Sequence, residues 1–186
     1  MALALIHPGP VKAISEFNST ELLQLLNENR PEKISFVEHR DVGMLREQVR
    51  AEGKIVFNPP DTVVREIISP YSQRMIFAGE SVTIIENGKV QHQMHRDDSP
   101  VLSALARFMG VLYAGNKVDE VKDYFKLSLD GDWQDWELKL QPKSRQARRH
   151  VKRVSLFGTR GRLERSELIE GNGDTRVTEY HREGGD

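Results

Sequence analysis

Cysteine is absent from the 186 residues, and so are long apolar runs. Without cysteine the chain cannot form disulfides, perform thiol catalysis or build a cysteine-ligated zinc or iron–sulfur site. No stretch is long and apolar enough to cross a bilayer as a helix. Residues 1–15 are interpreted as either a trimmed signal sequence or a flexible N-terminus, because they lack the basic start and the apolar length of a complete signal peptide.

A large excess of one charge is also missing, because 27 Lys and Arg residues stand against 28 Asp and Glu residues. Nucleic-acid binders usually carry a strong basic excess, so this balance argues against that class. Hydrophobic residues make up 38% and charged residues 30%, which is typical of a folded globular protein. No repeat, low-complexity tract or long linker divides the chain, so residues 1–186 are expected to form one domain.

Motifs with a known catalytic mechanism are missing as well. The chain has no Gly-x-Ser-x-Gly elbow, no Gly-x-Gly-x-x-Gly turn and no Gly-Lys-[Ser/Thr] loop. His92, His95, Asp97 and Asp98 are residue types that bind metals, but strand residues three apart point to opposite faces. The sequence therefore predicts a solvated strand end there, with no catalytic residues, cofactor or metal. An enzyme built on this segment and Trp133 stays as an alternative.

What the chain does contain is a series of short strand patterns. Asn18, Ser19 and Thr20 are good helix caps before a leucine stripe, so a helix is expected to end near residues 29–31. Alternating apolar residues then recur between turns such as Asn87-Gly88. The expected class is mainly β (α+β), an antiparallel barrel or sandwich of roughly ten or eleven strands. The expected strands are residues 34–40, 45–57, 62–69, 81–85, 89–95, 125–129, 133–140, 150–157, 162–170 and 175–181.

A second helix is expected to interrupt the strands between Ser99–Pro100, an N-cap followed by proline, and Gly115. Its apolar residues cover a wider arc than those of an ordinary surface helix. Two interpretations remain, a core helix that plugs the sheet and a lid over a large apolar cavity. The lid residues would be Leu102, Leu105, Phe108, Met109 and Leu112.

The segment 143–153 holds six basic residues and no acidic residue. Such a segment suits anionic lipid headgroups or an acidic partner, and a solvated hairpin rim is the alternative. A docking module that uses this hairpin is therefore a further functional hypothesis. Its docking residues would be Arg145, Arg148, Arg149, Lys152 and Arg153.

Several short stretches, taken in order, resemble the LolA-type outer-membrane lipoprotein carrier family. Phe36-Val37-Glu38 resembles the start of the family's first strand, and Leu140-Gln141-Pro142-Lys143 resembles its Leu-x-Pro-Lys. Between them the likeness runs from Gly53-Lys54-Ile55-Val56-Phe57 through Pro60-Asp61 and Pro70 to Gly79. The resemblance implies an unclosed, strongly curved antiparallel β-barrel with a helical lid and an apolar interior that receives acyl chains.

The function implied by this resemblance is a non-enzymatic periplasmic carrier, a monomer made with a signal peptide. Its cargo would be an acylated lipoprotein or a lipid, taken from an inner-membrane transporter to an outer-membrane acceptor, with peripheral membrane contact allowed. Shielding acyl chains from water is worth about 0.8 kcal/mol per CH₂. The cavity candidates are the apolar strand residues Ile55, Phe57, Val64, Ile67, Met75, Phe77, Val82, Ile84 and Leu138.

One position departs from the family pattern. The lipoprotein carriers have an arginine immediately before the proline that aligns with Pro60, and this arginine helps to hold their lid closed. Here that position is Pro59, which has no charge. Arg65, in the next strand, either replaces the latch or faces solvent. The departure predicts a divergent member of the family.

Overall fold

The computed structural model describes residues 17–43, 48–59, 61–95, 98, 106, 109 and 118–182. Eleven antiparallel strands form one sheet in the order β6-β5-β4-β3-β2-β1-β11-β10-β9-β8-β7. Their bounds are β1 Lys33–Asp41, β2 Val49–Asn58, β3 Thr62–Ser69, β4 Gln73–Ala78, β5 Ser81–Glu86, β6 Lys89–His95, β7 Phe125–Gly131, β8 Trp136–Pro142, β9 Val151–Thr159, β10 Arg162–Glu170 and β11 Thr175–Arg182.

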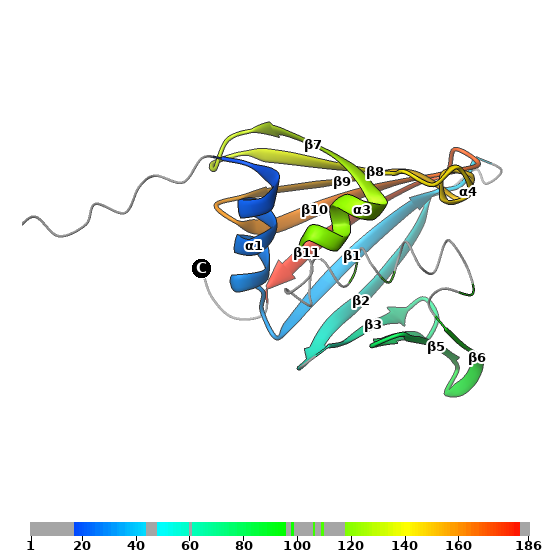
Figure 1. Ribbon diagram of the computed structural model, residues 1–186. Coiled ribbons are helices and arrows are strands. Elements are labelled where there is room, and N and C mark those ends of the chain that lie inside the picture. Colours follow the sequence, from blue (N-terminus) through cyan, green and yellow to red (C-terminus); the bar gives the residue numbers. More distant parts are fainter. Residues whose placement is uncertain are drawn as a thin grey trace, which may run out of the picture.

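The sheet is strongly bent but not closed into a barrel. Its two edge strands, β6 and β7, are not paired with each other in the part of the chain that the structure describes. Figure 1 shows two wings, β2–β6 and β7–β10, which diverge from the central pair β1 and β11. This arrangement confirms the mainly β, unclosed curved sheet that the sequence predicts.

Three short helices with described bounds accompany the sheet, and none of the described helices is long and apolar enough to span a bilayer. Helix α1 (Ser19–Glu28) and helix α3 (Val118–Tyr124) lie inside the bend and contact each other and β7 (Figure 1). Helix α4 (Arg145–Arg148) is a single turn between β8 and β9. Asn18 caps α1 because its side-chain oxygen accepts the backbone N–H groups of Thr20 and Glu21, each at 3.0 Å.

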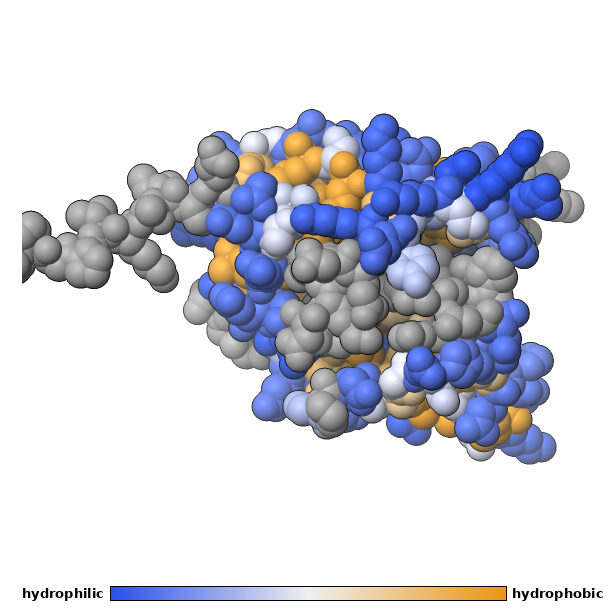
Figure 2. Space-filling model, in the orientation of Figure 1, coloured by the Kyte–Doolittle hydropathy of each residue, from blue (hydrophilic) through white to orange (hydrophobic). Residues whose placement is uncertain are grey.

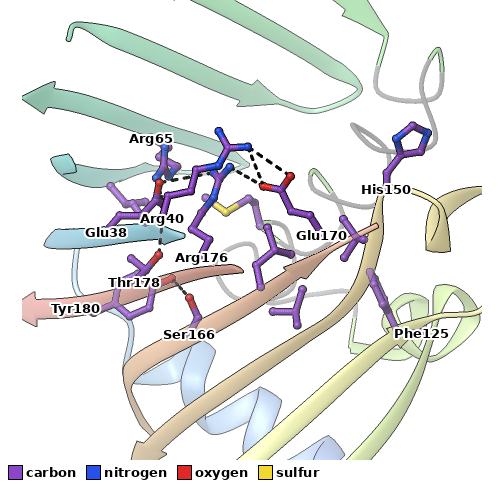
Figure 3. A pocket seen from close by; sticks show the side chains of 15 residues that line it. Glu38, Arg40, Arg65, Phe125, His150, Ser166, Glu170, Arg176, Thr178 and Tyr180 are labelled. Carbon is purple, nitrogen blue, oxygen red and sulfur yellow. Dashed lines mark hydrogen bonds and ion pairs between the residues drawn. The ribbon is translucent and has the colours of Figure 1, made fainter. Parts of the chain in front are cut away.

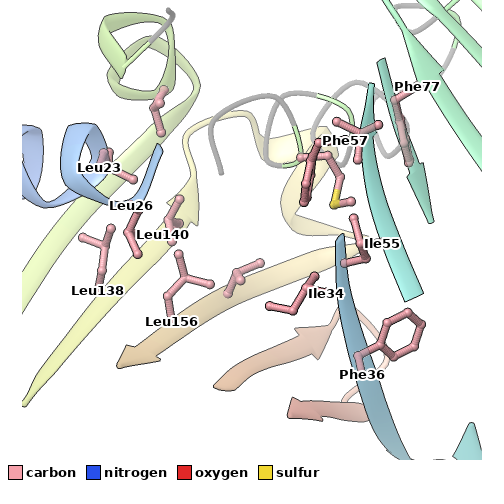
Figure 4. Close-up of a cluster of buried hydrophobic side chains, with 14 of the residues drawn as sticks. Leu23, Leu26, Ile34, Phe36, Ile55, Phe57, Phe77, Leu138, Leu140 and Leu156 are labelled. Carbon is pink, nitrogen blue, oxygen red and sulfur yellow. The ribbon is translucent and has the colours of Figure 1, made fainter. Parts of the chain in front are cut away.

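The hydrophobic core fills the concave side of the sheet. Leucines of α1 pack there against inward-facing residues of β1, β2, β8 and β9 (Figure 4). Strand alternation explains which strand residues belong to this core, because every second residue of a strand points to the same face. The labelled core side chains are Leu23, Leu26, Ile34, Phe36, Ile55, Phe57, Phe77, Leu138, Leu140 and Leu156.

The sequence predicted most element positions and missed some. The first helix is confirmed, and the strands 62–69, 89–95 and 162–170 have the expected bounds. Strand β4 contains Met75 and Phe77, which were expected to be strand residues, but no strand range was predicted for it, because it is only six residues long and closely follows the turn at Pro70. Trp133 lies before β8 instead of within it. Residue 45 and most of the expected helix 99–114 lie outside the described residues.

Gly53 allows strands β1, β2 and β3 to pack tightly at the bend. Its partner across the β1–β2 ladder is Phe36, whose ring covers the position where a side chain would stand. A Cβ atom on Gly53 would lie 2.1 Å from the Glu66 carbonyl oxygen and 2.5 Å from Cζ of Phe36. The glycine is therefore required by the close approach of backbone and ring.

We expect Gly53→Ala to lower the free energy of unfolding by about 2 kcal/mol, because the added methyl group overpacks a site that includes rigid backbone. Urea denaturation followed by circular dichroism measures the change. Gly43→Ala is the control, since its Cβ would meet only Asp174 Oδ1 at 4.0 Å. Equal stability of the two variants would contradict the packing described here.

Candidate functional site

A cavity of about 380 Å³ opens on the concave side of the sheet, where β1, β11, β10 and β9 face Met109 and Phe125 (Figure 3). One part of its wall is apolar and another part carries charges. The lining residues are Glu38, Arg40, Ile55, Arg65, Met109, Phe125, His150, Val151, Val154, Ser166, Leu168, Glu170, Arg176, Thr178 and Tyr180.

Strand periodicity places the polar side chains inside. Glu38 and Arg40 continue the inward positions that Ile34 and Phe36 occupy on β1. In the β1–β11 register, Glu38 lies opposite Thr178, and Arg40 lies opposite Arg176. Two arginines directly opposite each other repel, so this pairing needs a shared anion.

Glu170 is that anion. Its carboxylate lies 3.0 Å from Nη2 of Arg176 and 3.4 Å from Nη2 of Arg40. Asp174 adds a second carboxylate 3.7 Å from Arg40. The end of β10 therefore neutralises the two facing arginines of β1 and β11.

Glu38 forms the inner end of the same network and is buried. Arg65 donates to its Oε2 at 2.6 Å, and the hydroxyl of Thr178 donates to the same oxygen at 3.3 Å. Arg176 Nη1 lies 3.6 Å from Oε1. The guanidinium of Arg65 also lies 4.5 Å from the centre of the Phe36 ring. A buried carboxylate is stable only with such partners, and Glu38 has them on β3 and β11.

Tyr180 and Ser166 form a separate polar pair in the cavity wall. Their hydroxyl oxygens lie 2.8 Å apart. Burial raises the pKa of Tyr180 above its usual range, because the charged phenolate would lose its water. The hydroxyl therefore stays protonated and can donate a hydrogen bond at neutral pH.

The cavity candidates chosen from the sequence lie on the concave side with the exception of Val64, and Ile55 lines the cavity described above. Met75 packs against the core cluster, and Ile84 lies opposite it in the β4–β5 register and is half-buried. Val64 is buried outside this cluster, because its strand neighbours Val63 and Arg65 take the inward positions. The remaining candidates belong to the core cluster: Phe57, Ile67, Phe77, Val82 and Leu138.

Of the expected lid residues, Met109 is helical, buried and part of the cavity lining. Leu102, Leu105, Phe108 and Leu112 lie outside the described residues. Arg65 does not face solvent, which corrects one of its two expected positions. Only 13% of its side chain is exposed, because the guanidinium is paired with Glu38.

The basic segment 143–153 was expected to be a hairpin rim. In the structure it contains the helical turn α4 and the first residues of β9. The Arg148 side chain stabilises the turn before α4, because its guanidinium donates hydrogen bonds to the carbonyl oxygens of Pro142 and Lys143. The other four docking candidates are exposed and have no ion pair with any described residue. They are Arg145, Arg149, Lys152 and Arg153. Figure 2 shows strongly hydrophilic side chains around the end of the molecule where α4 lies.

The histidine segment is described in part, because Asp97 lies outside the described residues. Across the described ranges, no group of three or more side chains is placed to hold a metal ion. His95 lies 3.1 Å from Glu80, and His92 is exposed on the edge strand β6. Trp136 is buried in the core, and Trp133 packs edge-on against Phe17 with ring centroids 4.9 Å apart.

Sequence reasoning missed the charged wall of the cavity, namely Glu38, Arg40, Glu170 and Arg176. The missing step was to continue the alternation of Ile34 and Phe36 by two and four residues, which puts both Glu38 and Arg40 on the inner face. Charged residues in strands are usually assigned to the solvent face, and that assignment fails here.

Comparison with known proteins finds one matching family. The model of the family described as outer membrane lipoprotein carrier protein LolA-like matches residues 12–180. No curated protein matches the chain.

Among solved structures, a LolA superfamily protein from Nitrosomonas europaea is 11% identical with a TM-score of 0.45, over 91% of this chain and 96% of that chain. MucB, in the MucA/MucB complex from Pseudomonas aeruginosa, is 12% identical with a TM-score of 0.43, over 87% of this chain and 54% of that chain. Lipoprotein LppX from Mycobacterium tuberculosis is 8% identical with a TM-score of 0.40, over 91% and 99%. Similarities this distant indicate nothing about what this chain binds.

We expect Glu38→Ala to lower the free energy of unfolding by about 3 kcal/mol, because Arg65 would be left buried without its carboxylate. Chemical denaturation measures the loss. Glu52→Ala is the matched control on the neighbouring strand, where the Arg50–Glu52 pair is about half-exposed and contributes little. A loss for Glu38→Ala no larger than that of the control would contradict the buried network.

Proposed function

We propose that this chain, which belongs to the family of LolA-like outer membrane lipoprotein carrier proteins, carries acylated or lipidic cargo inside its curved sheet. The observation that supports the proposal is the cavity on the concave face, with its apolar wall of Ile55, Met109, Phe125, Val154 and Leu168. An acyl chain that enters such a wall is shielded from water, and each buried CH₂ group contributes about 0.8 kcal/mol.

The volume of the cavity suits one chain or one small amphiphile. About 380 Å³ lies at the lower end of the range of small-molecule pockets, roughly 300–1,000 Å³. A carrier also has to release its cargo, which favours a modest apolar contact area over a deep and closed one. We place this activity in the periplasm, where carriers of this family move lipoproteins between membranes without catalysing a reaction.

The basic segment supplies the surface on which the carrier meets a membrane. His150 and Val151 line the cavity, and their neighbours in sequence, Arg149 and Lys152, have exposed side chains. A basic cluster at that position brings the cavity close to anionic headgroups when the protein docks. A docking module without any cargo is the alternative, and the first experiment below distinguishes the two.

The first test fills the cavity. We expect Leu168→Trp to weaken binding of the neutral fluorophore N-phenyl-1-naphthylamine by about tenfold, because the indole would occupy space that the probe needs. Fluorescence titration measures the affinity, and thermal unfolding checks that the variant is folded. Ile68→Trp is the control, since Ile68 is an exposed strand residue outside the cavity. Wild-type protein that binds no probe, or a Leu168→Trp variant that binds it normally, would contradict the carrier proposal.

The second test concerns the membrane surface. We expect the wild-type protein to bind vesicles that contain phosphatidylglycerol and the double variant Arg145→Glu/Lys152→Glu to lose about tenfold in affinity, since each basic residue near an anionic surface contributes about 1 kcal/mol. Co-sedimentation measures binding, which added salt should weaken. The control is Arg74→Glu/Lys89→Glu, two exposed basic residues on β4 and β6. If both double variants lose the same affinity, the basic segment is not the docking surface. Arg148 is left unchanged because it holds the turn.

A further inference from the structure

The wall of the cavity contains charged residues that a carrier of purely apolar cargo would not need. Its ion pairs connect Arg65, Glu38, Arg176, Glu170 and Arg40 in one chain across β3, β1, β11 and β10 (Figure 3). Buried ion pairs add little net stability compared with apolar residues of the same size. An acyl chain gains nothing from facing them, because it cannot accept their hydrogen bonds. The network therefore calls for a ligand with polar chemistry.

The arginines of this network have N–H groups that make no hydrogen bond to the described residues. Each guanidinium has five N–H groups. The Nε atoms of Arg40 and Arg176 are buried and have no hydrogen-bond partner among the described residues. Arg40 also holds Glu170 only loosely, because the hydrogen bond from its Nη2 to Glu170 Oε2 is 3.5 Å long. Both side chains are partly open to solvent, so a ligand group can approach them from the cavity.

The guanidiniums of the described wall provide the donors that an anion needs. Arg40, Arg65 and Arg176 stand against Glu38 and Glu170 in the lining and against Asp174, 3.7 Å from Arg40, so the three positive charges are balanced and the attraction for an anion comes from the N–H donors that these pairs leave over. The protonated Tyr180 hydroxyl, which shares a hydrogen bond with Ser166, adds a neutral polar pair to the same wall. Met109, Phe125 and Val151 add apolar side chains to the same lining. The cavity thus combines polar and apolar groups, as an amphiphile does.

We propose that the cavity binds a single-chain amphiphile with an anionic headgroup, either a carboxylate or a phosphate. The headgroup oxygens accept hydrogen bonds from Arg40 and Arg176, where charge-assisted bonds are strong. The hydrocarbon chain lies against Met109, Phe125 and Leu168. This inference rests on the proposed carrier function and specifies its cargo class.

The test compares ligands that share one chain and differ only in the headgroup. Isothermal titration calorimetry is carried out with dodecanoate, dodecyl phosphate and 1-dodecanol, and with acetate and inorganic phosphate alone. We expect both anionic dodecyl ligands to bind about tenfold more tightly than dodecanol, because only they satisfy the arginine donors. Whichever of the two binds more tightly identifies the headgroup, and the short anions are expected to bind weakly.

Arginine variants link the difference to the network. We expect Arg40→Gln to remove most of the preference for the anionic ligands while dodecanol binds as before. Arg165→Gln is the control, since Arg165 is on β10 outside the cavity and stacks 3.9 Å from the centre of the Phe157 ring. Thermal unfolding of both variants confirms that they are folded.

The outcomes separate this inference from the carrier function itself. Equal affinity for dodecanol and the anionic ligands would overturn the headgroup site and leave the carrier proposal standing. An unchanged preference in Arg40→Gln would also overturn it. Acetate or phosphate binding as tightly as the dodecyl ligands would indicate an anion site without a lipid. If no dodecyl ligand and no neutral probe binds, the carrier proposal itself fails.

Discussion

A carboxylate removed from water must be surrounded by donors, and the Glu38 side chain imposes this requirement near the centre of the sheet. Its partners come from β3 and β11, on either side of the β1–β2 pair. The same arginine that satisfies it stacks on Phe36, and that ring in turn covers Gly53. The packing around Gly53 and the position of the cavity therefore both depend on the pair Glu38–Arg65. Moving either residue would leave a carboxylate or a guanidinium without its partner.

Under the proposed carrier function, this arrangement would let the cavity hold its cargo without trapping it. Apolar burial alone has no direction, so an acyl chain could slide or reverse within the wall. Hydrogen-bond donors at one side give the ligand an orientation, and their partial exposure leaves water able to compete for them. The exposed basic side chains that follow α4 are close in sequence to His150 and Val151, which line the same cavity.

The sequence predicted the architecture better than the site. Turn residues such as Asn87-Gly88 and the β-branched run 62–69, which stops at Pro70, gave clear strand bounds, because turn geometry and β propensity are largely local properties. The family resemblance added the curvature, which no local pattern contains. The residues of the cavity wall were harder to predict. Val63 and Val64 are both buried, and the residue types alone do not show which of the two faces inward. Arg65 was given a solvent position as one alternative, because its partner Glu38 is distant in sequence.

The pairing of β1 with β11 joins strands that stand more than a hundred residues apart, whereas every other ladder joins strands consecutive in sequence among those described. The halves β1–β6 and β7–β11 are therefore meanders with mostly local contacts, and such contacts form early because their loops close at little entropic cost. The long-range ladder that unites them is the slow step, since it needs both halves in place. The cavity, which takes its walls from both halves, exists only after that step. Under the proposed carrier function, a newly made chain would therefore be unable to load cargo until its final strand has docked, so synthesis and binding would be separated in time by topology alone.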